Sequence, residues 1–423
     1  MSLIKNTIER KRGLKIERKR GRGEEGKIKH PFILSSFRLF VLSSLLLLTA
    51  SSVRAADNKA VRVDRHIGLM GTTLTVSVEA LDRLTALAAS EKAVRALEAA
   101  EARLSTWQED TELARLNRAT VGKAVAISQK LAGELAAVRH WWKETNGAFD
   151  PGIGVLVDIW GLRQGGRRPT SNILAQAKSC PGLAALSLNG HTAVRQHPDL
   201  RIEEGGFGKG AGLDDAIRIL AASNILSATI NLGGQVAVIG NMRFFSLAIA
   251  DPANRQQIVL TVSIDQGAIA TSGNSQRGLV IEGTWYNHIL DPRSGWPAPD
   301  FGTLTVWAPD ALTADCLSTG LYVLGPDQAL DWAAQHPGIE VLVLETTGSN
   351  LQAHATAGWK DRIKVEDPRV ELVFEEKGKS SRMGRSKDGR VEEGKNPFPL
   401  AHLPTCLSAD RRAGFRQGIH HIR

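Results

Sequence analysis

Cysteine is scarce in this chain of 423 residues. It has three, Cys180, Cys316 and Cys406, and none of them stands in a C-x-x-C pair. Zinc sites and dithiol redox sites are usually built from such pairs, and an odd number of distant cysteines does not form a disulfide framework. We therefore expect each cysteine to be a small buried residue or an incidental one.

The central part of the chain lacks the positive charge that the total suggests. The formal net charge is +9, but residues 1–37 and 377–423 each carry a net charge of +7, which leaves −5 for the middle. A nucleic-acid-binding domain gathers Lys and Arg on its own surface. We therefore predict no nucleic-acid partner, and we expect residues 1–31 and 377–423 to be disordered basic tails.

The apolar run 39–50 is shorter than the roughly 20 residues of a membrane-spanning helix. Arg38 precedes it and Val53-Arg54-Ala55 follows it. A basic residue, a short apolar stretch and small residues are typical of a signal peptide. Residues 32–55 therefore predict export to the periplasm, with cleavage after Ala55. An uncleaved segment that associates the protein with the membrane is the alternative, and without a cysteine after the run no lipoprotein anchor is predicted.

The expected domain, residues 56–376, shows both helical and strand periodicity without regular βαβ alternation or internal repeats. This pattern predicts an α+β fold. We expect helices at 82–104, 128–146, 171–177, 210–220, 312–324 and 326–335. We expect strands at 227–231, 244–250, 257–264, 267–271, 278–287 and 302–308, and a last strand at 339–345.

Two side chains suited to proton transfer follow the expected strand 278–287. His288 and Asp291 are three positions apart, just before Pro292 and Gly295. Strand ends present reactive groups on a rigid support, and the ordinary pKa of histidine, near 6.5, suits a base at neutral pH. Asp291 would orient His288, hold a second metal or cap the turn. Taken alone, the motif is more often a tight turn with a surface histidine.

The segment Gly205 to Gly210 is rich in glycine, contains Lys209 and opens a helix. Exposed backbone N–H groups, a helix N-terminus and a lysine favour an anion such as a diphosphate. The spacing fits neither a Walker A loop nor a G-x-G-x-x-G motif. The alternative is a glycine-rich turn with a solvated lysine.

Asp315 and Thr319 are four residues apart and therefore share one face of the expected helix 312–324. A carboxylate and a hydroxyl suit a hard cation such as Mg²⁺. The alternative is an aspartate near a helix start together with a core-facing threonine. Two turns, 270–274 and 231–235, are either phosphate-binding or ordinary.

Taken together, these motifs resemble the ApbE family, the FAD:protein FMN transferases. No single motif is specific, but eight occur in order over residues 66–345. The matching segments are Met70-Gly71-Thr72, the stretch 104–117 around Trp107, Gly147-Ala148-Phe149-Asp150, Gly205 to Gly210, Asn231-Leu232-Gly233-Gly234, Thr271-Ser272-Gly273, His288 to Gly295, and Ala314-Asp315 with Ser318-Thr319.

The resemblance implies a T-fold-like α+β body with a mixed or antiparallel sheet and packed helices. It implies transfer of the FMN half of FAD, as a phosphoester, onto a threonine hydroxyl of an extracytoplasmic acceptor, such as a redox-complex subunit, with release of AMP. His288 matches the histidine thought to take part, supported by Asp291 and Lys209. Mg²⁺ would lie at Asp315, Thr319 and a backbone carbonyl near Gly206. The implied FAD contacts are Met70, Trp107, Ala148, Phe149, Asp150, Glu203, Lys209 and Ile289.

Several residues depart from the family pattern, and they leave the details of FAD contact open. Glu203 stands where the family usually has Asp, Gly208 where it often has Ala, Gln235 where it has an acidic residue or Asn, and Ser275 where Tyr is common. Trp107 would stack on a flat ring or be a buried core indole.

Two other functions are compatible with the sequence. One is an FAD-binding or FAD-hydrolysing relative that releases FMN and AMP. The other is a non-enzymatic, exported maturation scaffold, since a fold does not settle a function. Covalent flavin on a protein acceptor would exclude the first, and loss of function in Asp315→Ala would exclude the second.

Overall fold

The computed structural model describes residues 60–240, 244–273 and 278–375. These residues all belong to the compact unit that begins at Lys59. The expected tails, the signal segment 32–55, Cys406, Asn274 and Ser275 lie outside the described residues. Within the described ranges, no helix is both long and apolar enough to cross a membrane.

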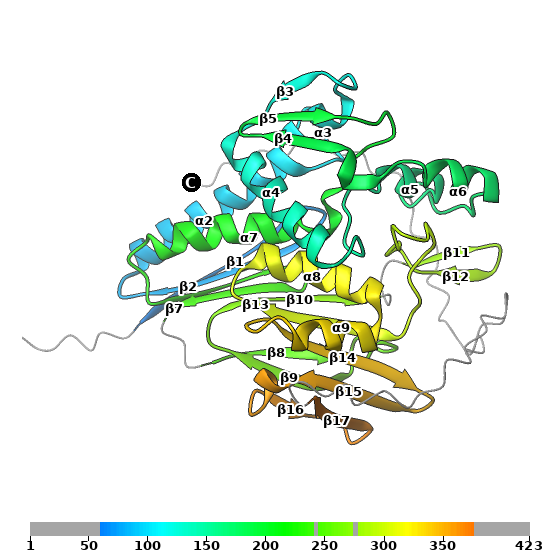
Figure 1. Cartoon of the computed structure of the whole chain (residues 1–423). Coiled ribbons are helices and arrows are strands. Elements are labelled where there is room, and N and C mark those ends of the chain that lie inside the picture. The colour runs from blue at the N-terminus through cyan, green and yellow to red at the C-terminus, as the bar shows by residue number, and fades with distance from the viewer. Residues whose placement is uncertain (1–59, 241–243, 274–277, 376–423) are drawn as a thin grey trace, which may run out of the picture. The chain divides into compact units, whose positions relative to one another are not determined.

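A nine-stranded sheet forms the centre of the fold (Figure 1). In their order across the sheet, the strands are β1 (Val61–Leu69), β2 (Thr72–Ala80), β6 (Ser227–Leu232), β7 (Gln235–Gly240), β10 (Gly267–Gly273), β13 (Gly302–Ala308), β14 (Glu340–Thr347), β15 (Asn350–Thr356) and β17 (Val370–Glu375). Neighbours pair antiparallel except β15 and β17, which are parallel. The mixed sheet with packed helices confirms the predicted α+β class.

Helices cover one face of this sheet. They are α2 (Arg83–Leu104), α7 (Gly208–Ala221), α8 (Ala311–Leu324) and α9 (Pro326–Ala334). The start of α2 is fixed by Asp82, whose carboxylate accepts the Thr85 N–H at 2.8 Å, as an N-cap does. Small residues such as Ala93 and Ala216 let α2 and α7 approach closely over the strands. The helices that carry the candidate site residues therefore rest on a rigid apolar base.

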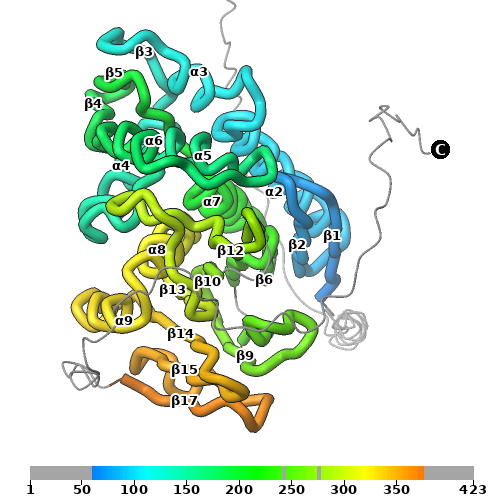
Figure 2. Tube along the Cα trace, turned by 90° about the vertical axis from the view of Figure 1, so that its right-hand side faces the viewer, coloured from blue at the N-terminus to red at the C-terminus, as the bar shows by residue number. Residues whose placement is uncertain are grey.

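A smaller sheet packs on the opposite face of the central sheet. Its strands, in order, are β16 (Ile363–Val365), β9 (Ile258–Ile264) and β8 (Phe245–Ala250). Leu260 and Val262 pack against Ile269 of β10 and Leu344 of β14 in one buried cluster. The centre of the protein is thus a helical layer, a large sheet and a small sheet (Figures 1 and 2).

An outer layer lies over α7 and α8 (Figure 2). Its helices and strands are α3 (Glu112–Arg118), β3 (Ala124–Ala126), α4 (Gln129–Glu144), α5 (Gly154–Ile159), α6 (Ser171–Ala177), β4 (Leu186–Asn189), β5 (Thr192–Arg195), β11 (Leu279–Ile281) and β12 (Thr284–Tyr286). Three short 3-10 helices are η1 (Gly182–Ala185), η2 (Glu204–Gly206) and η3 (Ala357–Trp359). Phe149, Phe207 and Leu312 join α4 to α7 and α8 in one apolar cluster.

Several predictions of strands were wrong. Residues 278–287 are a hairpin rather than one strand, because Glu282 and Gly283 adopt positive φ angles of 52° and 79° and reverse the chain. Strand β7 was not predicted; it begins at Gln235, directly after the turn at Gly233 and Gly234 that the sequence indicated. The strand at 340–347 is not the last, since β15, β16 and β17 follow it. Strands β1 to β5 were not predicted.

Candidate functional site

The N-termini of α7 and α8 cap each other. Asp315 of α8 accepts the Gly210 N–H of α7 at 2.9 Å. In return, Asp214 of α7 accepts the N–H groups of Ala311 at 2.7 Å and Leu312 at 3.0 Å. Carboxylates are favourable at both positions because a helix N-terminus carries partial positive charge and unpaired N–H groups. Burial raises the pKa of Asp214 to about 6.

This mutual capping requires glycine at position 210. A Cβ atom there would lie 2.3 Å from the carbonyl oxygen of Ala311 and 2.7 Å from the Cα of Leu312. We expect Gly210→Ala to lower the free energy of unfolding by about 1–3 kcal/mol, because the two helix ends would have to separate. Urea unfolding would measure this, with Gly205→Ala as the control, since no atom lies within 4 Å of a Cβ at Gly205. Equal losses in both variants would contradict the prediction.

The three expected metal ligands come together at this junction. Asp315 is 3% exposed, and its Oδ1 lies 3.3 Å from the Nζ of Lys209. Thr319, one turn further along α8, is half-buried. A Cβ at Gly206 would lie 3.3 Å from the Oγ1 of Thr319, so the glycine backbone closely approaches that hydroxyl. Asp315 and Thr319 therefore lie on one face of α8, as their i, i+4 spacing predicts, and this face meets the glycine-rich segment Gly205 to Gly210.

The oxygen atoms that could bind a metal at this junction fit a hard cation better than a soft one. Among the described residues, no group of three or more His, Cys, Asp or Glu side chains gathers at a point. Of the three expected ligands at this junction, Asp315 is the only one that brings a carboxylate, beside the Thr319 hydroxyl and a backbone carbonyl near Gly206. An all-oxygen set with few protein ligands is compatible with Mg²⁺, which usually keeps several waters.

The chain before His288 is fixed by buried polar contacts. Asn287, 4% exposed, accepts the Ile289 N–H at 2.9 Å and donates to the Tyr322 hydroxyl at 3.4 Å. That hydroxyl in turn donates to Asp300 at 3.2 Å, and burial together with this carboxylate raises the pKa of Tyr322. His288 is half-buried, and its Nδ1 is among the buried atoms. Its Nε2 is therefore the nitrogen better placed for a ligand.

Asp291 stabilises the turn that follows His288. Its Oδ1 accepts the backbone N–H and the Nε–H of Arg293, each at 2.9 Å, and its Oδ2 accepts from Nη2 at 3.1 Å. The turn closes through the Gly295 N–H, which donates to the carbonyl of Asp291 at 2.8 Å. The indole of Trp160 donates to the carbonyl of Gly295 at 2.8 Å and holds the turn against α5. Of the three roles considered for Asp291, these contacts support turn capping.

The expected FAD contacts at positions 148–150 and 289 are mostly buried. Ala148 and Ile289 pack in one cluster with residues of α8, and Phe149 is 2% exposed. The carboxylate of Asp150 accepts the N–H groups of Gly152 at 2.7 Å and Leu183 at 3.0 Å. Burial raises its pKa to about 6. These side chains shape the site by packing, and any ligand contact there falls largely to the backbone.

A cavity of about 210 Å³ lies beside this loop. Asp150 and Gly147 line it on one side, and Pro292 and Arg293 of the turn after His288 on another. Lys178, at the end of α6, contributes a second cation to its wall. The space between the 147–152 loop and the turn after His288 is therefore bordered by a carboxylate, Asp150, and by two cationic side chains, Lys178 and Arg293.

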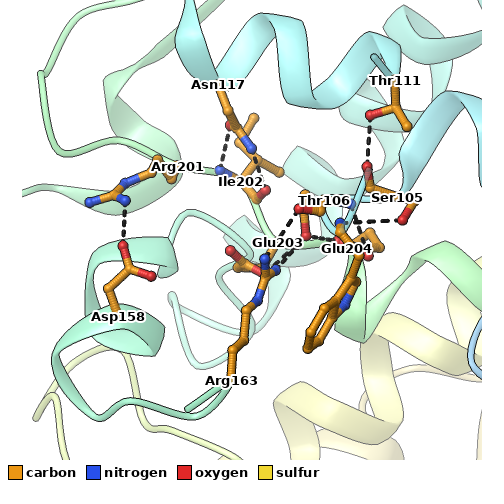
Figure 3. Close-up of polar contacts among 11 residues, drawn as sticks. Ser105, Thr106, Thr111, Asn117, Asp158, Arg163, Arg201, Ile202, Glu203 and Glu204 are labelled. Atoms are coloured by element: carbon orange, nitrogen blue, oxygen red, sulfur yellow. Dashed lines mark hydrogen bonds and ion pairs between the residues drawn. The ribbon is translucent and has the colours of Figure 1, made fainter. Parts of the chain in front are cut away.

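A second cluster lies where Ser105 and Thr106 end α2, and Figure 3 shows it beside η2. Thr106 donates its backbone N–H to Glu204 at 3.1 Å and its hydroxyl to both Glu203 and Glu204. Arg163 forms an ion pair with Glu203. Burial raises the pKa of Glu203 to about 7, and Arg163 opposes that rise.

Trp107 is 70% exposed, so the alternative of a buried core indole was wrong. The guanidinium carbon of Arg163 lies 4.5 Å from the centre of its ring. No part of the sequence analysis pointed to Arg163, since it lies in a polar stretch without periodicity and its partners are distant in the chain. The same holds for Asp214, whose cap across to α8 is not visible in either helix alone.

The remaining candidates surround the α7–α8 junction. Met70, in the turn after β1, has a positive φ of 49° and lies with its Cε 3.8 Å from a Cβ built at Gly212. Ser272 belongs to β10 rather than to a turn, and donates to Ser318 at 3.1 Å. Gln235 begins β7 and donates to the carbonyl of Ala311 at 2.9 Å. The strand ends thus support the first turn of α8.

A family model described as the ApbE family matches residues 70–343. The chain belongs to the ApbE family. A protein named FAD:protein FMN transferase from Haemophilus influenzae is 28% identical over 337 residues, which cover 75% of this chain and 96% of that relative. A protein of the same name from Rhodobacter capsulatus is 32% identical over 251 residues, 56% of this chain and 47% of the relative. The solved flavin transferase ApbE from Vibrio cholerae shares the fold, with a TM-score of 0.64 at 25% identity over 72% of this chain and 99% of that one.

In this ApbE-family chain, one continuous segment joins the two parts of the site. Glu203 lies in the cluster with Thr106 and Arg163, whereas Gly206 and Lys209 lie at the α7–α8 junction. The family and the fold predicted from the sequence are confirmed. The roles assigned to individual residues remain predictions, and the structure shows which of them share a location.

Proposed function

We propose that this protein moves the FMN half of FAD onto a threonine hydroxyl of an acceptor protein, with AMP as the leaving group and Mg²⁺ as a requirement. The observation that carries the proposal is the junction at which Asp315, Lys209 and the N-terminus of α7 meet beside Thr319 and Gly206. A diphosphate needs cationic partners, and a cation needs a carboxylate. Relatives named FAD:protein FMN transferase support the proposal.

The residues of this chain would divide the work as follows. Lys209 and the N-terminal end of α7 would hold the diphosphate. Asp315, Thr319 and a carbonyl near Gly206 would hold Mg²⁺, which would supply positive charge to neutralise the diphosphate. Nε2 of His288 accepts the proton of the acceptor hydroxyl as that oxygen attacks phosphorus. The Asn287–Tyr322 contact fixes the direction from which His288 acts.

The place of reaction is part of the proposal. The signal pattern at 32–55 supports export to the periplasm, with retention at the membrane if it is not cleaved. The acceptor would then be an extracytoplasmic domain, such as a redox-complex subunit, that presents a threonine.

The direct test mixes the purified protein with FAD, Mg²⁺ and an exported domain that carries a candidate acceptor threonine. The expected result is a flavin-fluorescent acceptor band on a denaturing gel, which a chelator abolishes. Conversion of FAD to FMN and AMP without such a band would favour the hydrolase instead. A protein that neither binds nor consumes FAD would contradict the proposal.

A further inference from the structure

Arg163 contacts Thr106 and Glu203 in the cluster that Figure 3 shows, and it also contacts Trp107. Its Nη1 donates to the carbonyl of Thr106 at 3.2 Å, and its Nη2 reaches the Thr106 hydroxyl and the Oε2 of Glu203. Its guanidinium also lies over the ring of Trp107. Arg163 thus ties the loop after α5 to the end of α2 and to the start of η2.

The contacts leave two ligand-binding surfaces open. One face of the Trp107 ring carries the guanidinium, while the side chain as a whole stays 70% exposed. Glu203 accepts from Thr106 and from Arg163 through Oε2, and no residue in the described ranges donates to its Oε1. A flat heteroaromatic ring system on the indole could therefore place one of its N–H groups, a ring N–H or an exocyclic amino group, against a carboxylate oxygen that is already held in place.

We propose that Arg163 is a positioning residue: it fixes Trp107 and Glu203 in one arrangement, in which Trp107 stacks on a ring of FAD and the Oε1 of Glu203 accepts a hydrogen bond from it. The inference rests on the proposed function, because it takes FAD as the ligand. It also explains how Glu203 fits a site where the family usually has Asp. The longer side chain reaches across to Arg163, which lies on a different loop.

Two charged groups act on Glu203 from the segments packed around it. Arg163, from the loop after α5, lowers its pKa, whereas Glu204, its neighbour at the start of η2, raises it. Because burial brings the pKa of Glu203 to about 7, its charge depends on Arg163 near neutral pH. The ionised carboxylate of Glu203 accepts the hydrogen bond from the FAD ring system. FAD affinity should therefore rise as the pH rises through about 7.

The test measures FAD affinity by flavin fluorescence from pH 6 to 9. Arg163→Met is expected to weaken binding about tenfold at pH 7, through loss of a charge-assisted contact and of the stacked guanidinium. It should also move the midpoint of the pH profile upward by about one unit, since a nearby opposite charge shifts a carboxyl pKa by that much or more. Arg163→Lys keeps the charge and should keep the wild-type midpoint. Glu203→Gln should make the profile flat.

The control is Arg168→Met. Arg168 lies in the same loop as Arg163, and its guanidinium carbon also lies over an indole, 5.5 Å from the centre of the Trp296 ring. The Arg168→Met substitution should leave FAD affinity unchanged. Titrations with FMN alone and with AMP alone show whether the isoalloxazine or the adenine stacks on Trp107. Only the half of FAD whose ring lies on Trp107 should bind more weakly to Arg163→Met than to the wild type.

Three results would overturn the inference. They are unchanged affinity in Arg163→Met, a loss of equal size at every pH with no midpoint shift, and an equal loss in Arg168→Met. A wild-type protein that shows the expected FAD profile but transfers no flavin would count against the proposed function alone. A failure of the inference about Arg163 can therefore be distinguished from a failure of the proposed function.

Discussion

Asp315→Asn should lower the rate of flavin transfer by about a thousandfold while the protein stays folded. The amide oxygen can still accept the Gly210 N–H, so the cap of α7 is retained. What is lost is the only carboxylate among the expected metal ligands, and with it the charge that faces Lys209. A bound cation contributes several kcal/mol to a phosphoryl-transfer transition state, and about 4 kcal/mol corresponds to a factor of a thousand.

The measurement is the initial rate of fluorescent labelling of the acceptor at saturating FAD, with thermal unfolding as a check on the fold. Asp331→Asn is the matched control, because Asp331 is an exposed aspartate on the neighbouring helix α9. Raising Mg²⁺ should recover part of the lost activity if Asp315 acts through the cation. Near-normal labelling by Asp315→Asn at low Mg²⁺ would show that the junction does not hold the metal.

His288→Ala should reduce the transfer rate by about a hundredfold to ten-thousandfold, the usual contribution of a positioned general base. FAD affinity should change much less, because the proposed diphosphate site lies at the α7–α8 junction and does not include the imidazole. Residual transfer should rise with pH as the acceptor hydroxyl becomes easier to deprotonate. Single-turnover labelling with pre-bound FAD separates this chemical step from FAD binding.

The matched control is His191→Ala, at an exposed histidine in the turn between β4 and β5. It should transfer flavin at the wild-type rate. If His288→Ala lost FAD binding in proportion to its loss of rate, His288 would be a ligand contact, and the base would have to be sought elsewhere. If it kept the wild-type rate, the histidine would belong only to the turn.

The features that were predictable from the sequence are those encoded over a few residues. Asp315 and Thr319 share a face because four residues make about one helical turn. The start of α4 followed from the N-cap at Ser128, whose hydroxyl accepts the Leu131 N–H at 3.1 Å. The ApbE-type fold was accessible because many short motifs occurred in order, although none of them was sufficient alone.

The features that escaped prediction depend on contacts between distant segments. Arg163 meets partners 57 and 40 positions away, at Thr106 and Glu203, and no local pattern reports such a pair. The hairpin at 279–286 is rich in β-branched and aromatic residues on both sides of its turn, as a single strand would be, and the positive φ angles at Glu282 and Gly283 reveal the reversal. Periodicity alone does not decide such cases.

The mutual capping of α7 and α8 has a consequence for how the site is assembled. The first N–H groups of the two helices are only partly satisfied from their own sequence: Asp310 caps the Thr313 N–H of α8, but the Gly210 N–H needs Asp315 and those of Ala311 and Leu312 need Asp214. The two helices are about a hundred residues apart in the chain, so closing this pair requires a large loss of loop entropy. Their ends therefore become ordered together and late in folding. The end of α7 proposed to bind the diphosphate and the face of α8 proposed to bind Mg²⁺ would then form only together, and a partly folded chain with one of the two helices would bind neither ion.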